Sequence, residues 1–292
     1  MDMQKRAQVK QGVDKAKGTA NKGADVAEQV TDSPWFRRAA RAGYIANGVI
    51  HLVLGVIAWN LAFGGGGEQA DQSGAVRTLS EQPFGMVLIW FCMLGAFMLG
   101  LWHVSEAIFA AMGRTTKDKS DRAKETVKGA GKAIAFFAIA STCITFAFGG
   151  DKDSGDEAQS LTATLMSNPA GAILLYAIGA GLVIAGGFYV YKGVSKKFEE
   201  DLKATSRKEI SKAITVTGVI GHAAKGLVLA AVGLLFIVAT AKNNPEESTG
   251  IDGALKAMLD QPFGQPLLAA VGAGLVLFGI YLFMRSAYDR MD

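Results

Sequence analysis

Residues 253–264 read GALKAMLDQPFG and introduce the last hydrophobic run of the chain. Residues 74–85 read GAVRTLSEQPFG, lie 179 positions earlier and introduce another such run. A more divergent copy, SLTATLMSNPAG at residues 160–171, lies 86 positions after the first. The chain therefore repeats one unit three times, and a repeat of this kind dictates how the rest of the sequence is interpreted.

The composition is typical of a membrane protein. Half of the 292 residues are hydrophobic, 36 are glycine, and the mean hydropathy is +0.25. Frequent glycine in long apolar runs is common in transmembrane helices, which need about 20 residues to cross a bilayer core of about 30 Å. A buried soluble core explains six consecutive runs of this length poorly. The runs cover about residues 43–63, 84–105, 132–149, 170–191, 221–241 and 263–284.

These runs predict an all-α, polytopic membrane protein. Its six transmembrane helices form three parallel two-helix repeats, related by pseudo-threefold symmetry about an axis along the membrane normal. The expected divisions are a basic polar cytoplasmic tail over 1–33, partly disordered, and repeats over 34–112, 113–197 and 198–292.

Charge placement predicts the orientation. Lys and Arg number nine in 1–41, seven in 113–132, seven in 192–212 and two after residue 284, whereas the other three connections carry four cations and eleven acids. Because basic loops remain in the cytoplasm, both termini should be cytoplasmic in a multi-pass plasma-membrane protein. No secretory signal is expected before the first span, since the opening segment is polar. The tail would contact anionic lipid rather than nucleic acid, because it lacks interleaved aromatic residues.

Repeated glycines predict where helices pack closely. In lipid, close backbone approach at small residues drives helix association. The spacings are not strict G-x-x-x-G, which favours packing within one chain over a dimer contact. The first helices carry Gly48 and Gly55 in one repeat and Gly226 and Gly233 in another, and the second helices carry Gly95 and Gly100, Gly181 and Gly186, and Gly274 and Gly279.

The repeated phrase itself predicts a two-turn helix that ends before a proline, with its apolar side formed by residues such as Val76 and Leu255. The proline should then occupy the first turn of the next span. Residues 192–220 are expected to form one helix that continues into the fifth span. The motif residues are Gln82, Pro83, Phe84 and Gly85, then Pro169 and Gly171, then Gln261, Pro262, Phe263 and Gly264.

Ionisable residues recur at equivalent places in the repeats. Glu106, Lys192 and Arg285 end the second helices, and Asn47, Lys132 and Lys225 begin the first ones. Near helix ends, Lys and Arg side chains can reach water, which is the simpler explanation for them. An intramembrane charge is otherwise a functional-site hypothesis, and Glu106 is expected to pair with Lys225 or Lys132.

His51, His103 and Glu106 form a second candidate group. His103 and Glu106 are three residues apart and share a helix face, with His51 at a similar depth. The three could bind a metal or relay protons. The favoured alternative is that the histidines are polar bundle residues that hydrogen-bond each other or Tyr44, so no metal and no cofactor is expected.

The sequence contains no catalytic, nucleotide-binding or calcium-binding motif. The acidic stretch 151–157 fails the EF-hand pattern, because glycine stands at its fifth position and Thr162 at its twelfth. Cys92 and Cys143 both lie within expected spans and are interpreted as packing residues.

The triple two-helix unit, with its Pro-x-Gly phrase and spaced glycines, resembles a bacterial membrane-protein family catalogued as a domain of unknown function. The resemblance covers about residues 35–290, and the middle copy departs from Gln-Pro-Phe-Gly with Asn-Pro-Ala-Gly at 168–171. It implies the six-span fold and no established activity. The leading hypothesis is a non-enzymatic accessory or scaffold protein that contacts the bilayer and other membrane proteins.

The alternative is a small-solute or ion pathway, for protons or cations, along the pseudo-threefold axis. Mitochondrial carriers also place three two-helix units around such an axis, but their Pro-x-[Asp/Glu]-x-x-[Lys/Arg] signature is missing from this chain. That comparison is an analogy of fold alone.

Overall fold

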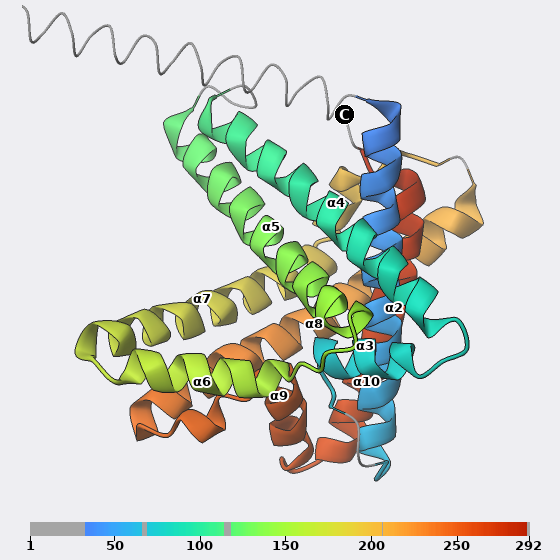
Figure 1. Cartoon of the computed structure of the whole chain (residues 1–292). Helices are drawn as coiled ribbons and strands as arrows, with labels where there is room; N and C mark the ends of the chain where they lie inside the picture. Colours follow the sequence, from blue (N-terminus) through green and yellow to red (C-terminus); the bar gives the residue numbers. More distant parts are fainter. Residues whose placement is uncertain (1–32, 66–68, 114–117, 206, 291–292) are drawn as a thin grey trace, which may run out of the picture.

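A computed structural model describes residues 33–65, 69–113, 118–205 and 207–290, and the prediction for the tail lies largely outside them. Within these ranges the chain is helical, with a single isolated β-bridge between Leu202 and Asp289 (Figure 1). The helices are α2 (Pro34–Ala62), α3 (Gln72–Ser80), α4 (Gly85–Ala111), α5 (Lys119–Ala147), α6 (Ser154–Met166), α7 (Pro169–Val194), η1 (Lys197–Asp201), α8 (Lys208–Lys242), η2 (Pro245–Glu247), α9 (Gly250–Leu259) and α10 (Gly264–Tyr288).

Six of the helices, α2, α4, α5, α7, α8 and α10, are long and apolar enough to cross a membrane. The protein is therefore an all-α, multi-pass membrane protein built from three tandem repeats, as the sequence predicts. The first span begins as expected, because the Ser33 hydroxyl accepts a hydrogen bond from the Phe36 amide (3.2 Å) and Pro34 occupies the first turn.

The repeated phrase forms a short helix in each unit, α3, α6 or α9, and these helices lie at one end of the bundle, called here the short-helix end. Helices α3 and α9 end at Ser80 and Leu259, before the prolines, which confirms the prediction. Val76 and Leu255 are buried and attach these helices to the spans.

The predicted place of the proline is correct in the middle repeat, where Pro169 opens α7 behind the capping residue Asn168. It is wrong in the other two. There a turn precedes the span, closed by hydrogen bonds from Gly85 N to Gln82 O (2.8 Å) and from Gly264 N to Gln261 O (2.7 Å). The third residue of such a turn needs a positive φ, and Phe84 and Phe263 both adopt φ 63°. The proline is used to shape the turn, and the span begins two residues later.

The long helices pack mainly across repeat boundaries. The second helix of each unit lies along the first helix of the next: α4 along α5, α7 along α8, and α10 along α2, which returns to the first unit (Figure 1). The α2–α10 pair contacts α4 on one side and α8 on the other. Helices α5 and α7 of the middle unit form no extended interface with each other.

Glycine seams hold two of these pairs together. A Cβ atom on Gly55 would lie 2.7 Å from the Gly272 carbonyl oxygen, and one on Gly233 would lie 2.6 Å from the Gly179 carbonyl oxygen. Two helical turns away along the same seams, Gly48 contacts Gly279 and Gly226 contacts Gly186 in the same way. Gly95, Gly100 and Gly274 also face close neighbours.

Gly181 is the exception to the predicted packing glycines, since nothing lies within 4 Å of a Cβ built there. The α7 seam uses Gly179 instead, seven residues before Gly186. Because a spacing of seven returns a helix to the same face, the Gly48–Gly55 spacing already contained the signal that identifies Gly179 and Gly272.

Candidate functional site

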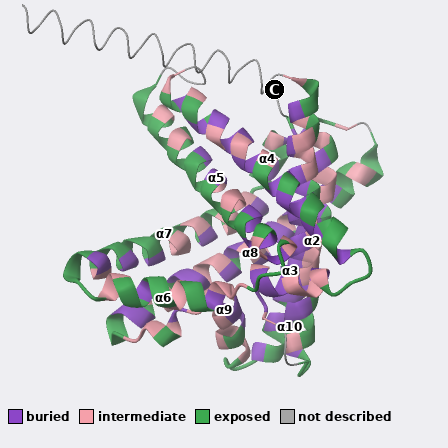
Figure 2. Cartoon of the chain, in the orientation of Figure 1, coloured by how far each residue is buried: buried purple, intermediate pink, exposed green. Residues whose placement is uncertain are grey.

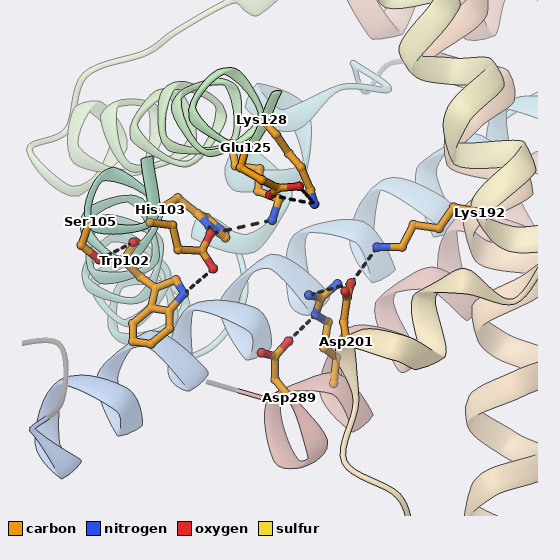
Figure 3. A network of polar contacts seen from close by, with 11 residues as sticks. Trp102, His103, Ser105, Glu125, Lys128, Lys192, Asp201 and Asp289 are labelled. Atoms are coloured by element: carbon orange, nitrogen blue, oxygen red, sulfur yellow. Dashed lines mark hydrogen bonds and ion pairs between the residues drawn. The ribbon is translucent and has the colours of Figure 1, made fainter. Parts of the chain in front are cut away.

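Glu106 anchors one half of a polar network at the end of the bundle where α4, α7 and α10 terminate, called here the basic end. Its carboxylate accepts hydrogen bonds from Trp102 Nε1 (3.1 Å) and His103 Nδ1 (2.7 Å), both on α4 (Figure 3). The Lys132 ammonium on α5 lies 3.9 Å away. Of the two cations expected to pair with Glu106, the structure places Lys132 beside it.

Lys225 has a different environment. Its ammonium donates to His51 Nε2 (3.4 Å) and lies over the rings of Phe278 (4.6 Å) and Tyr189 (5.4 Å). Among the described residues no carboxylate lies within ion-pair distance of it. Cation–π contacts of this kind partly replace the missing anion.

The expected cluster of His51, His103 and Glu106 is therefore only half formed. His103 contacts Glu106, but His51 belongs to the Lys225 group and donates through Nδ1 to the Asn47 carbonyl (2.9 Å). His51 lies on α2, which packs along α10, whereas His103 lies on α4, which packs along α5. The depth of a residue within its span does not reveal which helix packs beside it. In the described part of the chain, no three side chains of His, Cys, Asp or Glu gather closely enough to hold a metal ion.

Arg285 anchors the second half of the network. Its guanidinium bonds Asp289 (2.6 Å), lies 3.4 Å from Asp201 and stacks over the Tyr44 ring (4.9 Å). Asp201 in turn accepts a hydrogen bond from Lys192 (2.6 Å). Figure 3 shows this chain of contacts running from Lys192 through Asp201 to Asp289. The three helix-end residues predicted from the repeat thus enter two separate ion-pair groups.

The short helix η1 carries Asp201, the carboxylate that pairs with Lys192 and Arg285. Its presence shows that the expectation of one continuous helix over 192–220 is wrong. The chain breaks after Val194, turns through Lys196 at φ 57°, and forms one 3₁₀ turn before α8 starts at Lys208. Phe198 is fully buried against His222 (ring centroids 4.9 Å apart) and Tyr281 (5.3 Å). The anchored Phe198 holds Asp201 under the bundle.

The repeat explains why Lys192 requires a carboxylate such as Asp201 from another segment. Glu106 faces Lys132 across the α4–α5 pair, but the equivalent positions across α7–α8 are Lys192 and Lys225, which repel each other. A carboxylate from outside the repeat therefore pairs with Lys192. Burial opposes ionisation of Asp201, but the Arg285 and Lys192 cations still hold the pKa of its carboxyl below the ordinary value.

A second polar junction, which the sequence did not indicate, joins the short helices at the opposite end. The Ala70 amide donates to Asp252 of α9 (2.8 Å), and the hydroxyls of Ser73 and Ser154 share a hydrogen bond. Asp71 caps α3 and is buried, and burial raises the pKa of its carboxyl, with Asp252 and Asp153 adding to the rise. This junction fastens the starts of α3, α6 and α9 to one another.

Comparison with known proteins agrees with the repeat geometry. The family described as Domain of Unknown Function, DUF1206, matches the chain three times, at residues 42–110, 127–196 and 220–289. An uncharacterized protein, YxxB, of Bacillus subtilis (strain 168) is 30% identical over 259 residues, covering 88% of this chain and 93% of the relative. No solved structure matches the chain.

Proposed function

Since the chain belongs to the DUF1206 family, whose description assigns no activity, we propose that it is a non-enzymatic accessory or scaffold protein of the bacterial plasma membrane. The observation that carries this proposal is the filled interior at the basic end. Phe198 and Tyr281 are buried there, and Asp201 bridges Lys192 and Arg285. A packed helix bundle held by ion pairs suits a protein that presents helix faces to lipid or to other membrane proteins.

The glycine seams add to this proposal. They bring backbones into contact along α2–α10 and α7–α8 and so hold these helix pairs closely together. The large apolar residues left exposed, such as Ile173 and Ile184 on α7, then form the contact surface of the bundle.

A proton or cation pathway is the second candidate, and one observation favours it. Glu106 lies among His103, Lys132 and Trp102, and Lys225 contacts His51 in a second group, and titratable groups within the spans are what a proton relay requires. The two candidates make opposite predictions for the same substitution.

Glu106→Gln separates them. In a scaffold, Glu106 neutralises Lys132, so the substitution should lower the free energy of unfolding by about 1 kcal/mol. The charge swap Glu106→Lys with Lys132→Glu should restore part of this loss, whereas a swap with Lys225 should restore none. Melting in detergent measures these differences.

Proteoliposome flux completes the test. The scaffold proposal expects the wild-type protein to carry no more protons or cations across a pH gradient than empty liposomes do. A Glu106→Gln protein that melts like wild type but has lost a measurable pH-dependent flux would overturn the scaffold proposal and support the pathway.

The orientation is also a proposal, supported by the basic connections at the ends of α4 and α7. Single cysteines replacing Asp156 or Glu246 should react with an impermeant maleimide in intact cells. Cysteines replacing Lys119 or Lys212 should react only after the membrane is permeabilised. Both native cysteines are buried and give a low background. Labelling of the Lys119→Cys protein in intact cells would contradict this orientation.

A further inference from the structure

The middle repeat lacks a helix contact that the other two repeats make with equivalent residues. In the first unit a Cβ atom on Gly95 would lie 3.1 Å from both the Ala42 carbonyl oxygen and Ala46 Cβ. In the third unit Gly274 meets Ala224 and Ile220, which occupy the same two positions. The middle-unit counterparts of Gly95 and Ala46 are Gly181 and Gly131, and nothing lies within 4 Å of a Cβ on either.

Burial follows the same division. Only 17% of the most hydropathic window of α7 is buried, against 56% for α2 and α10, and Figure 2 shows α7 as largely exposed. Positions buried in the first and third units are open in the middle one. Three sets of equivalent residues show this, each given in the order first, third and middle unit with its exposed fraction. They are Ile50 (1%), Val228 (4%) and Ala135, which is exposed; Cys92 (1%), Val271 (2%) and Ile178 (37%); and Trp102 (9%), Tyr281 (0%) and Phe188 (52%).

One substitution in the repeat prevents α5 and α7 from closing as the other units do. Gly43 and Gly221 lie where the two helices touch, and a Cβ atom on Gly221 would come within 2.6 Å of Phe278 Cα. A Cβ atom on Gly43 would overlap the Gly95 carbonyl oxygen. The middle unit has Lys128 at this position, so the same close approach is excluded. The opening between α5 and α7 is therefore a built feature of the repeat.

Cations gather where this opening reaches the basic end. The ammonium groups of Lys128 and Lys192 point toward the space between the two halves of the polar network (Figure 3). The Lys225 ammonium also lies on this side, 5.4 Å from the centre of the Tyr189 ring of α7. Glu106 and Asp201 partner Lys132 and Lys192, and exposed Glu125 partners Lys128, which leaves Lys225 without a carboxylate among the described residues. The opening thus joins an apolar face to an excess of positive charge.

We propose that the opening between α5 and α7 binds one anionic phospholipid. Its headgroup phosphate lies between Lys128 and Lys192, and an acyl chain covers Gly131, Gly181 and Phe188. Glycines leave room for a flexible chain in the narrow part of the opening, and the cations complement the headgroup. A second protein helix would cover the apolar face but would add no negative charge to balance Lys225, the one lysine of this group without a carboxylate among the described residues, so the lipid fits both parts of the surface.

Native mass spectrometry of the full chain tests the site. The purified protein is titrated with phosphatidylglycerol and, separately, with phosphatidylcholine of the same acyl chains. We expect one phosphatidylglycerol to bind at least about tenfold more tightly. Each of Lys128→Gln and Lys192→Gln should weaken it about fivefold, as expected for one lysine near an anionic lipid. Lys212→Gln, at an exposed position near the start of α8, serves as a matched control.

Gly131→Leu tests the apolar part without altering any charge. Because Gly131 is exposed and has open space around it, the variant should melt like wild type yet bind the lipid at least about fivefold more weakly by excluding the chain. Equal binding of the two lipids would overturn the proposal, as would binding unaffected by both Lys128→Gln and Gly131→Leu. Inorganic phosphate that competes fully with the lipid would likewise show an anion site without a chain, contrary to the proposal.

A cross-linking experiment tests the role of Lys128 separately. Gly131→Cys with Gly181→Cys should not form a disulfide in the otherwise native chain. The added substitution Lys128→Gly should allow α5 and α7 to approach and the disulfide to form after the lipid is removed. A disulfide that forms equally well with Lys128 present would show that the opening closes freely, and would contradict the proposed site.

Discussion

Gly226→Leu is expected to lower the free energy of unfolding by about 3 kcal/mol or more, the upper range for overpacking a close helix contact. A Cβ atom on Gly226 would lie 2.5 Å from the Gly186 carbonyl oxygen and 2.7 Å from Val190 Cγ2. Backbone cannot move aside as a flexible side chain can. The α7–α8 pair would therefore separate along its whole seam and lose the van der Waals contact that holds helices together in lipid.

Leu227→Gly is the matched control at the next residue. Leu227 is 47% exposed, so its removal should cost about 1 kcal/mol, the penalty for glycine within a helix. The two variants are compared by thermal melting in the same detergent. Equal melting temperatures would show that the glycine seam contributes little, and the close-packing account of the fold would then be wrong.

Arg285→Met should be similarly damaging, at about 3–5 kcal/mol, because removal of one member of a buried ion pair leaves its partners charged and unpaired. The Arg285 side chain is 14% exposed and bonds the carboxylates of Asp201 and Asp289. Without it, Asp289 loses its 2.6 Å ion pair, and η1 loses the contact between Asp201 and Arg285. We expect the connection between α7 and α8 to detach before the helices separate.

Two further variants serve as a control and a rescue for Arg285→Met. Arg77→Met removes an exposed ion pair with Asp151 at the short-helix end and should change stability by less than about 1 kcal/mol. Adding Asp289→Asn to Arg285→Met should recover part of the loss. Limited proteolysis within residues 195–207 measures whether the connection opens. If Arg285→Met melts no lower than Arg77→Met, the ion-pair group at the basic end does not stabilise the fold.

The sequence predicted the features that depend on local periodicity. Six apolar runs of transmembrane length, a phrase repeated at constant spacing, and a serine followed by Pro34 each correspond to helices seen in the structure. Glycines seven residues apart identified a packing face, since that spacing is a property of a single helix. The same logic placed Glu106, Lys192 and Arg285 at one depth.

The middle repeat shows where this reasoning stops. Gly181 occupies the same place in the repeat as Gly95 and Gly274, yet it faces open space, because its partner helix does not approach. We attribute this to Lys128, which occupies the position of a contact glycine in the facing helix. An equivalence in sequence transfers to an equivalence in packing only if both sides of the contact are preserved.

The sequence alone determined the class of this protein, its three repeats and its six apolar runs, because each is a pattern within the chain itself. Tertiary structure decided the partners. That α4 packs along α5, that Lys132 reaches Glu106, and that Asp201 joins Lys192 to Arg285 are contacts between separate helices. The η1 turn that carries Asp201 is too short to produce a hydrophobic period, and Phe198 holds it in place only through rings from two distant helices.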